Sequence, residues 1–247
     1  MTATQDAPAA VDVGVGRTAW RQAASAGSAV MAFGFVVITT LAGEIIPPVV
    51  VMAVLFAALA VLLRKVSAPW PVYAGIALPV LAMVGNAPFV VADIGHPESA
   101  AGFVPMALVL FAALFTSVSS AIARFGPSIA VRPVATATVG LGVLAVAGSV
   151  AMTASLDDDE RRDGDVGVLA SNVEYPAELR VPEGEVGFYI ENDDVLRHTF
   201  LIEGTSVEQE VPGSTARRVS ADLEPGTYRY YCDVPGHEDM EGTLVVE

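Results

Sequence analysis

The sequence contains few of the cysteines that cross-link a domain and few of the charged residues that cover the surface of a soluble one. Its 247 residues include one cysteine, one lysine and three histidines, and only 17% are charged. A single cysteine cannot form a disulfide within the chain, so Cys232 must be free, paired with another chain or bound to a metal. By contrast, 53% of the residues are hydrophobic, and the mean hydropathy is +0.55. This composition excludes a single ordinary soluble domain.

Acidic residues are scarce in the first part of the chain and abundant in the second. Residues 1–154 contain five acidic and six basic side chains, whereas residues 155–247 contain 23 acidic and seven basic ones, a net charge of −16. The chain therefore joins two regions that are suited to different solvents.

Five apolar stretches in the first region predict membrane-spanning helices, because a span needs about 20 mostly apolar residues. The third stretch contains Pro79, Gly85, Asn86 and Pro88, which predict a kink or a break. The five stretches are Ala24–Gly43, Pro47–Leu63, Pro71–Ala92, Ala101–Ala123 and Pro133–Ala154.

Basic residues predict the orientation of these spans, since they accumulate in cytoplasmic loops. If five spans alternate, all six bases fall on one side, and the opposite loops near Glu44 and over Asp93–Ser99 contain none. We therefore expect a plasma-membrane protein with a cytoplasmic N-terminus and an extracytoplasmic C-terminal region. The six bases are Arg17, Arg21, Arg64, Lys65, Arg124 and Arg132.

Short β-branched and aromatic runs, separated by turn signals, follow an acidic stretch that is typical of a solvated linker. They predict a small antiparallel sandwich or barrel. We expect a tail over residues 1–22, a five-span domain over 23–154, a linker over 155–165 and a β domain over 166–247. The expected strands cover 166–171, 178–182, 185–191, 198–203, 217–223, 227–232 and 243–247.

Metal-binding side chains are concentrated in the segment YYCDVPGHEDMEG. Cys232, His237 and Met240 lie within nine residues, and His198 is the one other histidine of the β domain. A thiolate, two imidazoles and a weak thioether suit copper that alternates between Cu(I) and Cu(II), and a trigonal His₂Cys set with a distant Met is the blue-copper arrangement. Taken singly, each residue could instead be an ordinary core or surface residue.

The segments NDDVLRHTF and GTYRYYCDVPGHEDMEGTLVV resemble a cupredoxin, a member of the plastocyanin and azurin family of type 1 copper proteins. The resemblance covers residues 166–247 and none of the helices. It implies a Greek-key β-sandwich or barrel with one copper ion bound by His198, Cys232, His237 and Met240. It also implies that electrons pass through the edge of His237, with Val234 and Pro235 at the rim.

Three functions remain open. The chain could be a membrane-tethered one-electron carrier, a copper-handling protein for storage, delivery or sensing, or an accessory subunit of a membrane redox complex. The carrier is favoured, because the sequence has no Met-rich run and no recognisable substrate site. A second loop cysteine, which a binuclear copper centre would need, is also missing, and no histidine lies within the spans for a bis-His haem. We therefore do not expect an enzyme.

The expected partners are a redox protein such as a cytochrome or oxidase, the lipid bilayer and a further membrane subunit, with no nucleic acid. The acidity could steer a basic partner or reflect adaptation to high salt, and its even spread along the domain favours the second reading. His96, in the loop Asp93–Ser99, is expected to be an ordinary loop residue; the alternative is a second metal or quinone site.

Overall fold

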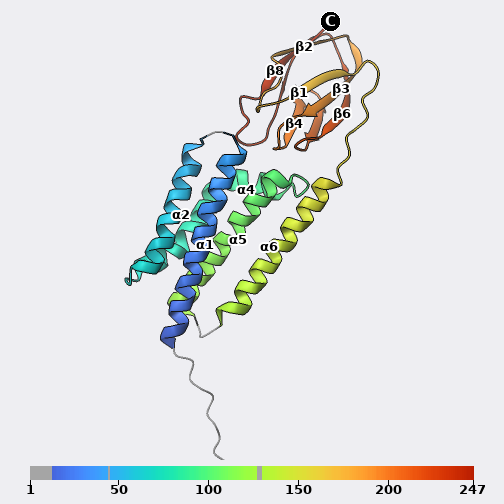
Figure 1. The fold of residues 1–247 in the computed structure, drawn as a ribbon. Coiled ribbons are helices and arrows are strands. Elements are labelled where there is room, and N and C mark those ends of the chain that lie inside the picture. Colours follow the sequence, from blue (N-terminus) through green and yellow to red (C-terminus); the bar gives the residue numbers. More distant parts are fainter. Residues whose placement is uncertain (1–12, 44, 127–129) are drawn as a thin grey trace, which may run out of the picture. The chain divides into compact units, whose positions relative to one another are not determined.

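The computed structural model describes residues 13–43, 45–126 and 130–247, and within them the first part of the chain forms six helices (Figure 1). Trp20 and Ala24, four residues apart, are both buried, so the apolar face of the first helix begins within the predicted tail. Residues 1–12 of that tail and Glu44 lie outside the described residues. The helices are α1 (Val13–Leu41), α2 (Pro47–Lys65), α3 (Trp70–Gly85), α4 (Ala87–Ile94), α5 (Ala100–Phe125) and α6 (Val131–Ala154).

The third predicted span is broken, as its glycine and prolines indicated. Helix α3 ends at Gly85, α4 begins at Ala87 after Asn86, and the two helices are bent by 75°. Pro88 lies in the first turn of α4. A backbone N–H at this position would have no partner within the helix, so proline is tolerated there.

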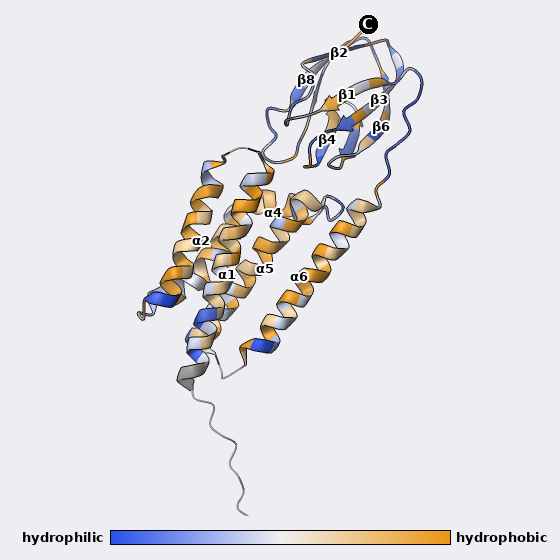
Figure 2. Ribbon diagram, in the orientation of Figure 1, coloured by the Kyte–Doolittle hydropathy of each residue, from blue (hydrophilic) through white to orange (hydrophobic). Residues whose placement is uncertain are grey.

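The helices consist largely of hydrophobic residues (Figure 2), and many of these residues are exposed. Four of them, α1, α2, α5 and α6, are long and apolar enough to cross a membrane, and α3 with α4 would make a fifth span if counted as one. Within α6, Ser149 is the buried residue, while Val139, Leu141 and Leu144 are exposed. Apolar patches of this extent indicate contact with lipid or with another protein.

Small residues allow the helices of the bundle to pack closely. A Cβ atom at Gly27 in α1 would overlap Thr116 Oγ1 in α5, and one at Gly75 in α3 would overlap Ser120 Oγ in α5. Ser25 in α1 donates a hydrogen bond of 2.7 Å to the Ala60 carbonyl oxygen in α2. This combination of small residues and hydroxyl groups is typical of helix contacts in membranes.

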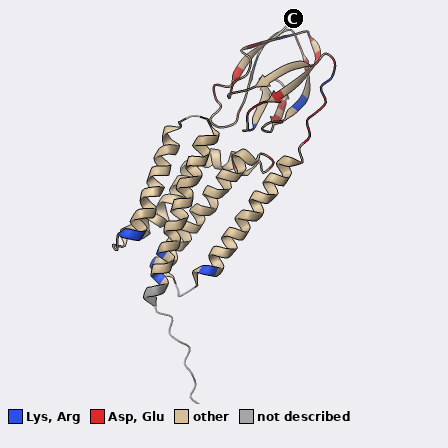
Figure 3. Ribbon diagram, viewed as in Figure 1, with Lys and Arg blue, Asp and Glu red and all other residues tan. Residues whose placement is uncertain are grey.

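In the helical part, basic residues lie at or near helix ends, whereas most acidic residues lie in the linker and the β domain (Figure 3). Arg21 of α1 donates hydrogen bonds to carbonyl oxygens of Leu63, Val66, Ser67 and Ala68, at and beyond the end of α2. Arg124, in the last turn of α5, donates a hydrogen bond of 2.8 Å to the hydroxyl of Tyr73 near the start of α3. The start of α1 and the end of α2 therefore meet, as do the end of α5 and the start of α3.

Eight strands form the C-terminal part of the chain. One sheet has the order β1–β3–β6, and the other has the order β2–β8–β7–β4–β5. The strands are β1 (Val166–Ala170), β2 (Glu178–Val181), β3 (Gly184–Asn192), β4 (His198–Ile202), β5 (Glu208–Val211), β6 (Ala216–Leu223), β7 (Gly226–Tyr231) and β8 (Glu241–Val246).

Strand pairing is mixed, whereas the sequence pattern suggested an antiparallel arrangement. The pairs β1–β3 and β2–β8 are parallel, and the pairs β3–β6, β4–β5, β4–β7 and β7–β8 are antiparallel. The sequence reasoning also missed β5, because three of its four residues are polar and Val211 is its one buried side chain.

A single hydrophobic cluster fills the β domain. Phe188, Phe200, Tyr230 and Leu244 are fully buried in it, and Cys232 and Met240 belong to the same cluster. Alternate residues of β3 point inward, as expected for a strand with one face on a core. The core therefore extends from the centre of the two sheets to the loop with the predicted copper ligands.

The acidic linker has more structure than its composition suggested. The Ala216 N–H donates to Asp158 Oδ1 at 2.8 Å, and the Arg218 N–H donates to Asp159 Oδ2 at 2.7 Å. The Asp159 N–H in turn donates to the Ala216 carbonyl oxygen at 3.1 Å. The linker thus satisfies backbone groups of β6 that the strand ladder leaves unpaired.

Candidate metal centre

The loop between β7 and β8 is held by two consecutive turns. The His237 N–H donates to the Val234 carbonyl oxygen at 3.0 Å, and the Met240 N–H donates to the His237 carbonyl oxygen at 2.9 Å. Pro235 and Gly236 occupy the centre of the first turn, and Gly236 has a φ of 94°, which is the geometry that a Pro-Gly pair favours. The Cys232 N–H then donates to the Met240 carbonyl oxygen at 2.9 Å and closes the loop.

Strand β4 supplies the remote histidine. It pairs with β7 through Leu201–Tyr231 and Ile202–Tyr230, so the start of β4 lies beside the end of β7, where Cys232 follows. His198 is completely buried. Two residues 34 positions apart in the sequence are thereby brought together by an antiparallel ladder.

A carboxylate orients the His198 ring. Its Nε2 atom lies 2.9 Å from Asp194 Oδ2, and Nδ1, the other ring nitrogen, points toward His237. Because an Asp carboxylate accepts hydrogen bonds, Nε2 carries the proton and Nδ1 presents its lone pair. Such a carboxylate behind a histidine fixes the tautomer that can bind a metal.

Hydrogen bonds hold Asp194 itself. Burial would raise the pKa of this carboxyl group, but hydrogen bonds from the Val173 N–H, from His198 and from the Asn172 N–H hold that pKa below its ordinary value. Asn192 supports the same turn: its Oδ1 accepts from the Asp194 N–H at 2.9 Å, and its Nδ2 donates to the Leu196 and Val211 carbonyl oxygens. Asp194 is therefore ionised and fixed in place.

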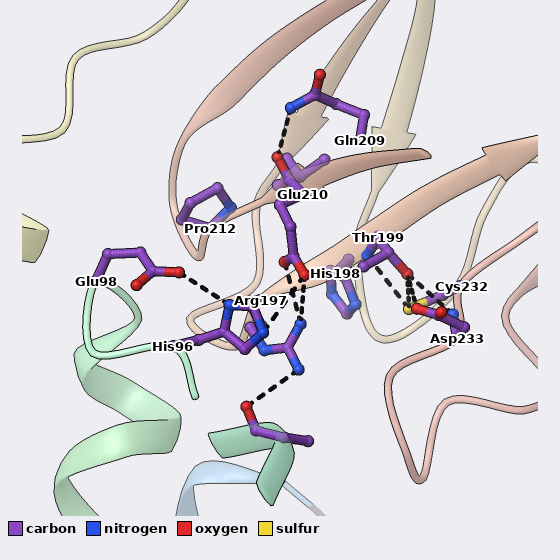
Figure 4. A network of polar contacts seen from close by, with 12 residues as sticks. His96, Glu98, Arg197, His198, Thr199, Gln209, Glu210, Pro212, Cys232 and Asp233 are labelled. Carbon is purple, nitrogen blue, oxygen red and sulfur yellow. Dashed lines mark hydrogen bonds and ion pairs between the residues drawn. The ribbon is translucent and has the colours of Figure 1, made fainter. Parts of the chain in front are cut away.

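Three donor atoms converge in the interior of the domain (Figure 4 shows His198 and Cys232 among them). His198 Nδ1 lies 3.1 Å from His237 Nδ1, and Cys232 Sγ lies 3.7 Å from His237 Nδ1. The donor atoms of all three residues lie within 4.8 Å of one another, and all three residues are buried. Nothing larger than a single ion fits among atoms this close, and one sulfur with two nitrogens is the donor set of type 1 copper.

Both imidazoles are suited to bind metal in their neutral form. Burial lowers the pKa of His198 below its ordinary value. Burial, followed by the proximity of His198, lowers the pKa of His237 to about 4. A metal ligand must be unprotonated, so both rings are ready to bind at neutral pH. His237 keeps 9% of its surface exposed, whereas His198 keeps none.

Met240 is buried, with 1% of its surface exposed, and lies in the same loop. Its backbone atoms bond to His237 and Cys232. Together with His198, Cys232 and His237, it fits a type 1 copper site. The assignment of the four side chains as ligands, and of the Met240 sulfur as the axial one, stays a prediction.

Several supporting residues were missed by the sequence reasoning. Thr199 contacts the Cys232 sulfur and Asp233 contacts Thr199: the Thr199 N–H lies 3.4 Å from Sγ, and the Thr199 hydroxyl lies 2.7 Å from Asp233 Oδ1. Asn192 and Asp194 belong to the segment ENDD before His198, where Asn and Asp are typical of turns that hydrogen-bond their own backbone. That turn signal was available in the sequence, but it indicated a loop and not a support for a ligand.

His96 is not one of the three residues whose donor atoms converge. Its Nδ1 atom is 3.0 Å from Glu98 Oε1. Over residues 13–43, 45–126 and 130–247, one group of three or more His, Cys or acidic residues could hold a metal ion, and His96 is outside it. His96 lies in the loop between α4 and α5, as expected, whereas the alternative of a second metal or quinone site stays a prediction.

Known proteins resemble the second part of the chain. Residues 142–246 match the model of the cupredoxin-like domain family, and no curated protein matches the chain. A reduced amicyanin variant is 26% identical over 36% of this chain and 87% of its own, with a TM-score of 0.31. A copper-containing nitrite reductase from Thermus scotoductus SA-01 is 20% identical over 38% of this chain and 24% of its own, with a TM-score of 0.30. The family match and the eight strands together identify the C-terminal part of the chain as a cupredoxin-like domain.

Proposed function

We propose that this chain, whose C-terminal part is a cupredoxin-like domain, is a membrane-tethered type 1 copper protein that transfers single electrons. The observation that carries the proposal is the convergence of His198 Nδ1, Cys232 Sγ and His237 Nδ1 within 4.8 Å in the domain interior. Copper held by one thiolate and two imidazoles can accept and release one electron without a change of ligands.

The chain's part in this reaction is to keep the donor atoms in place. Asp194 holds the His198 ring, and the bond from Cys232 to Met240 closes the loop. Tyr175 donates a hydrogen bond of 2.7 Å to the carbonyl oxygen of Thr199, and so anchors the start of β4 in the core. A site built on strands and supported in this way reorganises little when an electron arrives or leaves.

His237 is the proposed point of electron entry and exit. Of the two imidazoles, His237 is the one with exposed surface. It lies next to Gly236, in a turn that also contains Pro235. The proposed partner is a redox protein such as a cytochrome or an oxidase, which would approach this edge. A further membrane subunit could cover the exposed apolar surface of the helices.

The helices support a membrane tether with a defined orientation. The bases at the start of α1 and the end of α2 lie together, since Arg21 bonds to carbonyl oxygens from Leu63 to Ala68. Clustered bases favour the cytoplasmic face. We therefore propose that the N-terminus is cytoplasmic and that the copper domain is extracytoplasmic.

The decisive experiment uses the full chain, purified in detergent and loaded with Cu(II). We expect one copper ion per chain and an intense blue or green colour that Cys232→Ser abolishes, because the colour arises from the thiolate. A colourless complex, or a coloured Cys232→Ser variant, would contradict the type 1 assignment.

A parallel measurement separates the carrier from a copper-handling protein. Electron self-exchange and copper transfer to a chelator are followed on the same preparation. Fast exchange with retained copper supports the carrier, whereas rapid loss of copper to the chelator with slow exchange would favour storage or delivery.

A further inference from the structure

The Thr199 hydroxyl group has three neighbours at the edge of the metal centre (Figure 4). Its Oγ1 atom lies 2.7 Å from Asp233 Oδ1, 2.9 Å from the Asp233 amide nitrogen and 3.5 Å from Cys232 Sγ. Thr199 is 3% exposed, whereas Asp233 lies at the surface. The hydroxyl therefore connects an exposed carboxylate to the buried sulfur.

The hydroxyl has only one proton to donate, and two possible acceptors compete for it. The Asp233 N–H already donates to Oγ1, so the two residues are joined by a reciprocal pair of hydrogen bonds. A separation of 2.7 Å to a carboxylate oxygen is in the range of strong, charge-assisted hydrogen bonds. The separation of 3.5 Å to the sulfur is much longer, so the proton points to Asp233.

The consequence for the sulfur is a reduced number of hydrogen bonds. With the hydroxyl proton held by Asp233, the Thr199 N–H, at 3.4 Å, remains as the donor to Cys232 Sγ. The hydroxyl oxygen then faces the sulfur with a lone pair instead of a proton. Hydrogen bonds to the sulfur help to set the reduction potential of a copper–thiolate site.

We propose that Asp233 is a positioning residue that withholds the Thr199 proton from the Cys232 sulfur and thereby lowers the reduction potential of the site. The inference rests on the proposed function, since it concerns the thiolate of a copper-loaded centre. Asp233 acts through Thr199 and touches no predicted ligand atom. The reduced form, with more negative charge on its sulfur, gains most from an added hydrogen bond, so freeing the proton favours reduction.

The test compares two substitutions of Asp233 in the full chain. Asp233→Ala removes the acceptor and frees the proton, whereas Asp233→Asn removes the same charge but keeps an oxygen acceptor for the hydroxyl. We expect Asp233→Ala to raise the reduction potential more than Asp233→Asn. Its thiolate-to-copper absorption should also shift to higher energy, and its Cu–S stretching frequency should fall.

Thr199→Val provides the matched background, because it keeps the shape of the side chain and removes the hydroxyl. In that background, Asp233→Ala and Asp233→Asn should give equal potentials, since no proton remains to be released. Equal potentials for the two variants with Thr199 intact would overturn the inference and leave only an effect of charge. A wild-type chain without copper or colour would instead refute the proposed function, so the two failures are distinguishable.

Discussion

At the residue scale, the predicted ligand His198 depends on neighbours that are not ligands themselves. Asp194 accepts from its Nε2 atom at 2.9 Å, and Asn192 holds the backbone of Asp194. The ring is thereby turned so that Nδ1 faces Cys232 and His237. The contacts around the ligands therefore help to set the geometry of a metal site, as the ligands themselves do.

Asp194→Ala is expected to weaken copper binding by about 10- to 100-fold, because the His198 ring loses the group that sets its tautomer and orientation. Asp194→Asn should lose less, since its side-chain oxygen can still accept from Nε2. Copper affinity is measured by competition with a chelator of known affinity. Asp193→Ala, which removes a neighbouring exposed acid, is the control and should bind as the wild type does; an Asp194→Ala variant with unchanged affinity would contradict this role.

At the element scale, local sequence signals predicted some features well. The Pro-Gly pair in the loop after β7 forms the turn that such a pair favours, with Gly236 at a φ of 94°. Asn86 separates α3 from α4 in the stretch where glycine and prolines predicted a break. Each of these features depends on a few adjacent residues, so the sequence carries enough information to locate them.

Other elements depend on neighbours that are distant in the sequence. Strand β5 is polar apart from Val211, and it forms because β4 offers it an edge. The parallel pairing of β1 with β3 and of β2 with β8 follows from the arrangement of the two sheets. Strand propensity is weak and depends on context, so neither feature could be read from local composition.

Gly75 permits the close contact of α3 with α5, and its substitution tests that contact. In an ordinary helix, Gly→Ala gains about 1 kcal/mol of helix propensity. At Gly75 the added Cβ atom would overlap Ser120 Oγ, so Gly75→Ala is expected to destabilise the helical part by about 1–3 kcal/mol. The measurement is the thermal unfolding midpoint of the full chain in detergent.

Gly140 in α6 is the matched control, because nothing lies within 4 Å of an added Cβ atom there. Gly140→Ala should leave the midpoint unchanged or raise it. Adding Ser120→Ala to Gly75→Ala should recover part of the lost stability, since it removes the overlapping oxygen. Equal midpoints for Gly75→Ala and Gly140→Ala would show that the α3–α5 contact does not limit stability.

At the scale of the whole molecule, the chain combines an apolar helical part with an acidic β domain. One compact unit contains most of α1, all of α2 and α3, most of α5 and the first half of α6; the other contains the end of α1, α4, the start of α5, the second half of α6 and all eight strands. The division by composition at residues 155–165 therefore differs from the division into compact units. The domain boundaries over 1–22, 23–154, 155–165 and 166–247 stay predictions.

The predicted orientation can be tested with a labelled cysteine. In a Cys232→Ser background, Ser67→Cys places a thiol in the segment after α2, beside the clustered bases, and Ser171→Cys places one in the β domain. We expect a membrane-impermeant maleimide to label position 171 in intact cells and position 67 only after permeabilisation, because basic loops stay in the cytoplasm. The reverse pattern would overturn the orientation, and labelling of both positions in intact cells would contradict an odd number of spans.

The sequence by itself determined the apolar and acidic parts of the chain, the run of apolar helices, the break in the third predicted span and the four candidate ligands. These features follow from composition, from the length of apolar runs and from side-chain chemistry, all of which are local. Only the tertiary structure decided that Asp194 orients His198 and that Thr199 lies between Cys232 and Asp233. Those contacts join β4 to the segment after β7, and their distances depend on how the strands pair and pack, which no local pattern encodes.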